Sequence, residues 1–399
     1  MSVCAIDNYR INENIVQIIW NMGIRCTYDC SYCPSFRHSL TKPFQSLEAH
    51  KRSIDFLKEW IELHDQHLNP ESKRIYDINL TGGEPTAIPH LIEALSYLKE
   101  QVPMGEITLT SNGFVSRNTL DTITKDFIKH ITFSYHAEAS QSQKDIVLEN
   151  ILKCKEYVED ENYELNNFQV NLMMHEDPEL FKHCQEVKKI LQDENIRVMP
   201  RTIDRDDKVQ MRGREEVSKI KNSSFGPRPG MKYTNDQLVA ITGIYKKDLG
   251  ATKTLELKQT QKMTQVNGRP CCGGLTLRTL DDETNDWTDT KVIYNRNFKD
   301  WYCLVNLQWL CIEQDDDQIF THQTCKANFD GPWKGPVGKI SEYETYIDFL
   351  KSNFNKGQMP IIKCPNNICS CGICTPKSTN KETLEKVFKR ILPEVDPIF

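Results

Sequence analysis

The chain has 399 residues, a length that suggests two to three domains and leaves room for a large buried core. Its 50 Lys and Arg against 56 Asp and Glu give a net charge of -6, so no overall basic field exists to bind nucleic acid non-specifically. The sequence has no apolar run long enough to span a membrane and no N-terminal secretory signal. We therefore expect a soluble, cytoplasmic protein with no membrane association and no general nucleic-acid binding.

Six short β-rich segments alternate with helical segments in the first half of the chain. The predicted strands cover residues 15–21, 75–80, 106–110, 131–135, 168–174 and 196–200. The predicted helices between them cover residues 46–64, 89–101, 117–129, 143–158 and 178–193, with apolar residues at spacings of three, four and seven. Ser46 fits a helix N-cap, and Pro89 and Pro178 fit first helical turns.

This alternation predicts an α/β fold, with a parallel sheet and helices outside it. Both an open doubly wound sheet and an incomplete barrel satisfy the pattern, and in either one ligands bind at the carboxyl ends of the strands. After about residue 202 the alternation stops. Residues 234–247 and 381–392 are the two later helices that the sequence suggests.

Cysteine is the most informative residue type. The chain has 15 cysteines, an odd number that fits poorly with a disulfide framework. In a reducing compartment, clustered cysteines indicate metal ligands or catalytic thiols. Cys154 and Cys184 stand alone in helical patterns, so we expect them to be small core residues.

The first cluster contains Cys26, Cys30 and Cys33, directly after the first predicted strand. Three thiolates on one loop can hold a [4Fe–4S] cluster and leave its fourth iron open, and an open position on a metal site is where chemistry takes place. The alternative is a structural zinc site, for which His38 is the nearest additional ligand.

The cysteine spacing, with Tyr32 as the aromatic residue before the third cysteine, resembles the radical S-adenosylmethionine (SAM) superfamily. Three more segments match in order at successive strand ends. Residues 81–85 look like the family's GGEP motif, residues 110–113 are similar to its T-x-N-G motif, and Ser134 is similar to its strand-end serine.

The resemblance implies a partial (β/α)6 barrel, similar to a TIM barrel, over residues 1–205. It implies a [4Fe–4S] cluster on Cys26, Cys30 and Cys33, with SAM bound to the open iron. One electron from the cluster would cleave SAM to methionine and a 5′-deoxyadenosyl radical, and this radical would abstract hydrogen from a substrate. The expected enzyme is therefore a radical SAM oxidoreductase or maturase, supplied with electrons by an external reductase of the flavodoxin or ferredoxin type.

The same resemblance implies the residues that contact SAM. They are Tyr32, Gly82, Gly83, Glu84, Pro85, Asn112 and Ser134. Glycines allow close backbone approach, and the Glu84 carboxylate can accept hydrogen bonds from the methionine ammonium group. Asn112 with Gly113 also fits a simple turn, and Ser134 an ordinary strand-end hydroxyl. His136 lies on the same strand face as Ser134, where it either lines the substrate cavity or is a buried, hydrogen-bonded histidine.

A second field of cysteines occupies the last third of the chain. Its candidate metal ligands are Cys303, Cys325, Cys364, Cys369, Cys371 and Cys374. Thiolates of this density bind either zinc or iron–sulfur clusters. The region resembles the auxiliary-cluster domains called SPASM and Twitch, which implies one auxiliary cluster, a [4Fe–4S] centre, and a β-hairpin over residues 307–320. Residues 206–267 would connect the core to this auxiliary domain at residues 268–399.

The sequence does not assign a single role to three other cysteines. Cys311 falls inside the predicted hairpin and fits a core residue. Cys271 and Cys272 would add a ligand, line the active site or be structural.

The resemblance implies a peptide or protein substrate. The alternative is a small molecule or nucleotide, because an arginine-bearing segment follows the last predicted strand and can bind phosphate or carboxylate. Its arginines, which also fit a solvated surface, are Arg201, Arg205, Arg212, Arg214 and Arg228. A second alternative is a zinc- or cluster-binding protein without catalytic activity.

Overall fold

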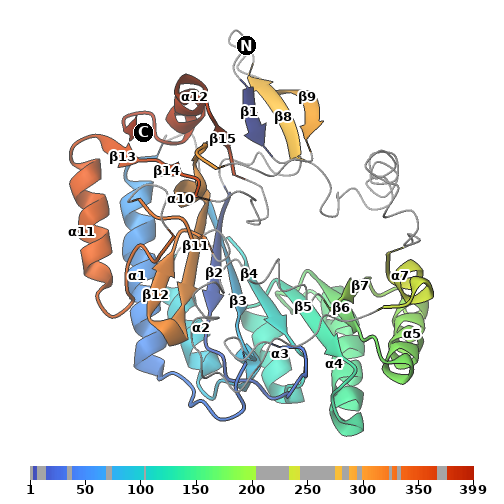
Figure 1. Cartoon of the computed structure of the whole chain (residues 1–399). Helices are drawn as coiled ribbons and strands as arrows, with labels where there is room; N and C mark the ends of the chain where they lie inside the picture. Colours follow the sequence, from blue (N-terminus) through green and yellow to red (C-terminus); the bar gives the residue numbers. More distant parts are fainter. Residues whose placement is uncertain are drawn as a thin grey trace, which may run out of the picture.

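The structure is a computed structural model and is shown in Figure 1. It describes residues 3–6, 15–33, 38–68, 74–102, 105–203, 233–242, 275–280, 287–293, 299–322, 326–329, 334–365 and 375–399.

The described residues form an eight-stranded sheet with the order β12-β11-β2-β3-β4-β5-β6-β7. Six of its strands are parallel and follow one another in chain order, which fits an incomplete barrel rather than a doubly wound sheet with a reversal of strand order. These strands are β2 (Ile15–Asn21), β3 (Ile75–Thr81), β4 (Ile107–Ser111), β5 (His130–His136), β6 (Asn167–Met174) and β7 (Val198–Thr202). All six predicted strands are confirmed, with ends shifted by no more than a few residues.

Helices connect these strands and cover the outer face of the curved sheet (Figure 1). They are α1 (Leu47–Asp65), α2 (Leu91–Gln101), α3 (Arg117–Asp126), α4 (Gln141–Glu159) and α5 (Pro178–Asp193). Ser46 caps α1 by accepting a hydrogen bond from the Ala49 N–H, and Pro178 begins α5, as predicted. α2 begins two residues after Pro89, with His90 as its N-cap residue. Among the described residues, none of the helices combines the length and apolar character needed to cross a membrane.

The two faces of the parallel sheet differ in polarity. The face toward the helices is apolar and buried, for example at Ile78 and Leu80 of β3. The opposite face carries half-buried polar side chains that bond across strands. The Arg201 Nε donates to the Asn171 Oδ1 at 3.1 Å, and the Gln169 Nε2 donates to the Thr132 Oγ1 at 3.2 Å. The alternation of side chains along each strand thus leaves a polar inner face on the sheet.

The C-terminal half of the chain completes the other edge of this sheet. β11 (Trp309–Glu313) pairs parallel with β2, and β12 (Gln318–Phe320) folds back antiparallel on β11. The turn between them contains the short helix η4 (Gln314–Asp316), so the hairpin predicted over residues 307–320 is confirmed. Its attachment to β2 was not predicted: part of the segment assigned to an auxiliary domain extends the core sheet and covers the edge of β2.

A second, six-stranded sheet among the described residues joins both ends of the chain, in the order β14-β10-β15-β1-β8-β9. Its strands are β1 (Val3–Ile6), β8 (Leu275–Leu280), β9 (Trp287–Ile293), β10 (Tyr302–Cys303), β14 (Ile362–Lys363) and β15 (Lys377–Ser378). β1 pairs with β8 and β15, so the first residues of the chain belong with the C-terminal strands rather than with the core expected over residues 1–205.

The remaining elements lie around these two sheets. α7 (Asn235–Thr242) falls within the helix predicted over residues 234–247, and α12 (Lys381–Ile391) matches the final predicted helix. α10 (Val305–Gln308), α11 (Tyr343–Phe354) and the parallel pair β13 (Gln358–Pro360) and β16 (Asp396–Ile398) were not predicted.

A buried histidine in α1 makes the stability of the fold depend on pH. His64 is 1% exposed, and its Nδ1 donates to the Trp60 carbonyl oxygen at 2.7 Å. Burial lowers the pKa of His64 from 6.5 to about 3. In acid the unfolded chain therefore binds a proton at this imidazole that the folded chain excludes.

We expect this histidine to contribute to acid destabilisation. Its contribution is fully present above pH 6.5 and is lost as the pH falls below 6.5, because protons then bind preferentially to the unfolded state. From pH 6.5 to 5 the loss is about 2 kcal/mol, at about 1.4 kcal/mol per pH unit. Urea unfolding at both pH values should show a smaller pH dependence for His64→Leu than for the wild type, and equal dependence would contradict the assignment.

Candidate functional site

The three N-terminal cysteines lie on the loop that follows β2. Cys30 is buried and Cys26 and Cys33 are half-buried, and the Cys33 N–H donates to the Cys30 carbonyl oxygen at 3.0 Å in a tight turn. Burial is the main cause that raises the pKa of Cys30 to about 12, and the neighbouring thiols raise it further. Cys30 therefore stays protonated unless a cationic partner such as a metal centre binds its thiolate.

The surroundings of these thiols bear on zinc, the alternative metal for this loop. Within the part of the chain that the structure describes, no three His, Cys, Asp or Glu side chains converge on a point where one metal ion would bind. His38, the fourth ligand considered for zinc, is hydrogen-bonded to the Tyr28 carbonyl oxygen.

The end of β3 is joined to the cysteine loop through the backbone. The Gly83 N–H donates to the Gly23 carbonyl oxygen at 2.7 Å, and the Glu84 N–H donates to the Arg25 carbonyl oxygen at 2.8 Å. A Cβ on Gly83 would lie 2.2 Å from the Arg25 oxygen, and one on Gly82 would lie 2.3 Å from the Gly23 oxygen. Both glycines are thus required by the segment that leads into Cys26, whatever ligand binds nearby.

Glu84 is buried among donors from the chain itself. Its Oε1 accepts hydrogen bonds from the Thr86 N–H at 3.0 Å, the Thr86 hydroxyl at 2.7 Å and the Ser111 hydroxyl at 2.8 Å. Its Oε2 accepts one from the Asn112 N–H at 2.6 Å. Burial raises the pKa of Glu84, and these donors oppose that shift. The carboxylate therefore ties the ends of β3 and β4 together, and the contact with a SAM ammonium group that the resemblance implies would compete with these internal donors.

Asn112 joins the end of β4 to the cysteine loop. Its Nδ2 donates to the Thr27 Oγ1 at 2.9 Å and lies 3.8 Å from the Cys26 sulfur. Its Oδ1 accepts a hydrogen bond from the Phe114 N–H at 2.9 Å, so the residue also forms a turn. Pro85 begins the short helix η1 (Pro85–Ala87) and is buried, while Ser134 is half-buried beside Asn171 in the β5–β6 register.

The end of β5 contacts the cysteine loop through an aromatic residue. The Tyr32 hydroxyl is hydrogen-bonded to the His136 Nδ1, and the two rings stack with centroids 5.9 Å apart. Burial lowers the pKa of His136 to about 4, so the imidazole in this pair is neutral. His136 is thus a hydrogen-bonded member of the site itself.

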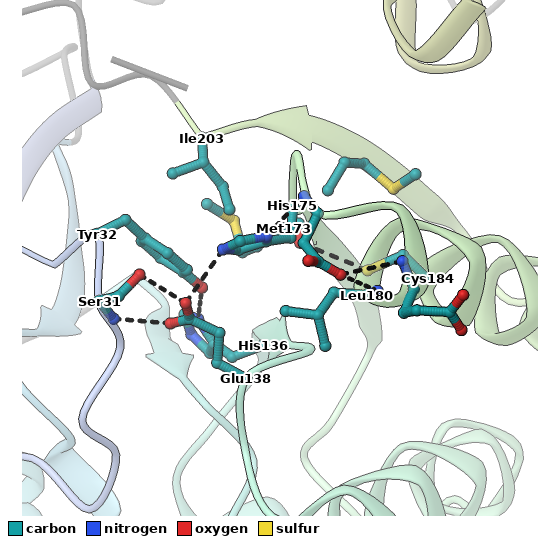
Figure 2. A network of polar contacts seen from close by, with 12 residues as sticks. Ser31, Tyr32, His136, Glu138, Met173, His175, Leu180, Cys184 and Ile203 are labelled. Atoms are coloured by element: carbon teal, nitrogen blue, oxygen red, sulfur yellow. Dashed lines mark hydrogen bonds and ion pairs between the residues drawn. The ribbon is translucent and has the colours of Figure 1, made fainter. Parts of the chain in front are cut away.

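Glu138 and His175 also contact this loop, although the sequence analysis did not select them (Figure 2). The Glu138 carboxylate accepts hydrogen bonds from the Ser31 N–H at 2.7 Å and the Ser31 hydroxyl at 2.5 Å, and the His175 Nε2 lies 3.1 Å from it. The sequence contained one indication that Glu138 belongs to the site: it lies two residues beyond His136, just past the end of β5. Neither residue falls within a recognised motif, and the contact with Ser31 is not local.

Two candidate ligands of the second cysteine field are described, Cys303 in β10 and Cys364 just after β14. Both are buried. Cys303 pairs with Ile362 of β14, and the Cys364 N–H just after β14 donates to the Trp301 carbonyl oxygen at 2.8 Å, so the two cysteines belong to adjacent segments of the chain. The other candidates lie outside the described residues: Cys325, Cys369, Cys371, Cys374, Cys271 and Cys272.

Three cysteines expected in the core are confirmed there. Cys154, Cys184 and Cys311 are each 0% exposed, in α4, α5 and β11. Of the arginines that follow the last core strand, Arg201 lies on β7 and the others lie outside the described residues.

Solved structures with similarity to the chain share little sequence with it. A structure titled as BtrN in complex with AdoMet and 2-DOIA is 19% identical, with 33% of this chain and 54% of that chain covered and a TM-score of 0.25. SuiB of Streptococcus suis bound to precursor peptide SuiA is 13% identical, with coverage of 52% and 46% and a TM-score of 0.34. Native anSMEcpe with bound AdoMet and Kp18Cys peptide is 9% identical, with coverage of 94% and 96% and a TM-score of 0.44. The chain thus spans only about half of BtrN, and at these TM-scores the likenesses add nothing to the assignment.

A family model gives the assignment. Residues 20–162 match the model described as the Radical SAM superfamily, and no curated protein matches the chain. The matched segment contains the three-cysteine loop and the strand ends bonded to it, and the family implies a [4Fe–4S] cluster and SAM. Residues 20–162 of this chain therefore match a radical SAM domain, and this match supports an enzyme of the radical SAM class.

Proposed function

We propose that Cys26, Cys30 and Cys33 hold a [4Fe–4S] cluster beside a SAM site at the carboxyl ends of β2 to β5. When bound, this pair supplies a 5′-deoxyadenosyl radical that abstracts hydrogen from a substrate. The observation that carries the proposal is the convergence of four strand ends on one loop. Gly83, Asn112 and Tyr32 each take part in a hydrogen bond that ties the loop to another strand.

The chain's own residues prepare this site before any ligand binds. Glu84 holds the β4 turn, and Asn112 presents its amide beside the Cys26 sulfur. Neutral His136 orients the Tyr32 ring, which the family resemblance places near the adenine of SAM. Because these contacts lie between strand ends of one sheet, the loop has little to reorganise on binding.

The proposal includes an auxiliary iron–sulfur centre in the second cysteine field. Its support is the buried placement of Cys303 in β10 and of Cys364 just after the neighbouring strand β14. The remaining ligands would come from Cys325, Cys369, Cys371 and Cys374. A centre with four thiolates would transfer electrons, whereas one with an open iron would also bind substrate.

We propose that the substrate is a peptide. An external reductase would supply the electrons that the cluster needs. The polar inner face of the sheet, with amides and hydroxyls such as those of Gln169, Asn171 and Thr132, suits a substrate rich in hydrogen-bonding groups. A second candidate is a small anionic molecule or nucleotide, which is favoured by the Arg201 guanidinium on the same face.

Anaerobic purification followed by electron paramagnetic resonance tests the central proposal. We expect a brown protein with more than four irons per chain, a cube signal on reduction that changes when SAM is added, and 5′-deoxyadenosine formed with dithionite and SAM. A colourless protein with stoichiometric zinc would refute it. Cys371→Ala addresses the auxiliary centre, because it should lower the iron content and block product formation yet spare SAM cleavage.

A further inference from the structure

We propose that Glu138 is a positioning residue for the cysteine loop: its carboxylate, oriented by His175, holds the segment between Cys30 and Cys33 in the shape that binds the cluster. This inference rests on the proposed function. It assigns a role to two residues outside the motifs that the sequence analysis used.

The contact is directed at the turn that carries two of the cysteines. Ser31 follows Cys30, and both its backbone N–H, at 2.7 Å, and its hydroxyl, at 2.5 Å, donate to Glu138. The turn is closed by the hydrogen bond from the Cys33 N–H to the Cys30 carbonyl oxygen at 3.0 Å. A change in the orientation of the Ser31 peptide would therefore move the sulfurs on both sides of it.

His175 fixes the orientation of the Glu138 carboxylate. Its Nδ1 accepts a hydrogen bond from the Asp177 N–H at 3.0 Å, so its ring proton is on Nε2 and points to the Glu138 Oε1 at 3.1 Å. Asp177 is the N-cap of α5, which makes this histidine a link between a helix end and the carboxylate. The side chains of Glu138 and His175 are 19% and 12% exposed, so water competes weakly for these bonds.

Only a carboxylate satisfies this arrangement. Its two oxygens face three donors, from the Ser31 N–H, the Ser31 hydroxyl and the His175 Nε2. A glutamine would place an NH₂ group against either the Ser31 N–H or the His175 ring proton, and His175 cannot switch tautomer without losing its bond to the Asp177 N–H. Glu138→Gln therefore disturbs the loop with almost no change in side-chain volume.

The chain offers a matched control at the other end of β5. There the His130 Nε2 lies 2.8 Å from the Glu106 Oε2, in a second glutamate–histidine pair. This pair is at the amino end of the strand, away from the cysteine loop, so Glu106→Gln makes the same substitution in a glutamate–histidine pair without touching the site.

The test measures how fast reconstituted protein loses iron to a chelator. Loss of a direct outer contact to a metal ligand typically costs 10–100-fold in metal affinity, and Glu138 acts one step further out, through Ser31. We therefore expect iron release about tenfold faster for Glu138→Gln, the lower end of that range, and no change for Glu106→Gln. Ser31→Ala keeps the backbone contact and should fall between the wild type and Glu138→Gln. Thermal unfolding of the cluster-free proteins should give equal midpoints for both glutamine variants, which separates loop positioning from a loss of overall stability.

The outcomes separate this inference from the proposed function. If the wild type binds the cluster and cleaves SAM while Glu138→Gln and Glu106→Gln release iron at the same rate, the role of Glu138 is wrong and the proposed function stands. If Glu138→Gln fails to fold, Ser31→Ala decides: iron release at the wild-type rate overturns the inference. If the wild type binds no cluster, the proposed function itself fails.

Discussion

Replacing Cys30 by alanine should abolish SAM cleavage, with 5′-deoxyadenosine falling to background. Cys30 is the middle cysteine of the loop and is 6% exposed. Two thiolates do not retain a [4Fe–4S] cube that needs three protein ligands when SAM occupies the fourth iron. The variant should therefore lack the cube signal after anaerobic reconstitution, and chromatographic measurement of 5′-deoxyadenosine with dithionite and SAM checks the loss of activity.

Cys154→Ala is the control for this experiment. Cys154 is also a buried free cysteine, but it lies in α4 and not on the cysteine loop. Both substitutions remove a buried thiol and leave a similar small cavity, so the comparison isolates the loss of a ligand from the loss of packing. Full SAM cleavage by Cys30→Ala, or an equal loss of cleavage in Cys154→Ala, would contradict the ligand assignment.

Gly83→Ala should damage the site through the backbone alone. The added Cβ would lie 2.2 Å from the Arg25 carbonyl oxygen, so the end of β3 must move away from the cysteine loop and weaken the 2.8 Å bond from the Glu84 N–H to the same oxygen. Overpacking of this kind costs about 1–3 kcal/mol of unfolding free energy. A shift of about 1 Å at a reacting centre costs about 100-fold in rate, and we expect a fall of that order in SAM cleavage.

Gly335→Ala provides a matched glycine substitution. There the nearest atom to the added Cβ is the Asn328 side-chain Nδ2 at 3.3 Å, and a flexible amide can move by a few tenths of an ångström. Urea unfolding and SAM cleavage should therefore be close to those of the wild type. If Gly83→Ala behaved like Gly335→Ala, the close approach between β3 and the cysteine loop would not matter for function.

Local patterns in the sequence were sufficient for the core strands and their parallel pairing. β2 to β7 were predicted because alternating apolar residues specify a strand from a few neighbouring positions, and the helices between them specify parallel pairing. The three-cysteine loop was predicted for the same reason, since Cys26, Cys30 and Cys33 all lie within one short segment. The hydrogen bonds between these strand ends could not be predicted from such patterns.

Glu84 illustrates the difference. Its motif was visible in the sequence, but the structure shows its carboxylate engaged by Thr86, Ser111 and the Asn112 N–H. Which donors surround a buried carboxylate depends on how two strand ends approach each other in space. The same holds for Glu138, whose partner Ser31 is 107 residues away in the chain.

The sequence by itself determined that six β–α units carry a cysteine loop and polar strand ends in the order of a radical SAM domain, because each of these features is specified by near neighbours. Only the tertiary structure decided that β11 lies against β2, that β1 joins the C-terminal strands, and that Glu138 holds Ser31. Edge pairing and hydrogen bonds between distant segments depend on the relative positions of whole elements. Those positions follow from the packing of the complete core, and no local window of the sequence contains them.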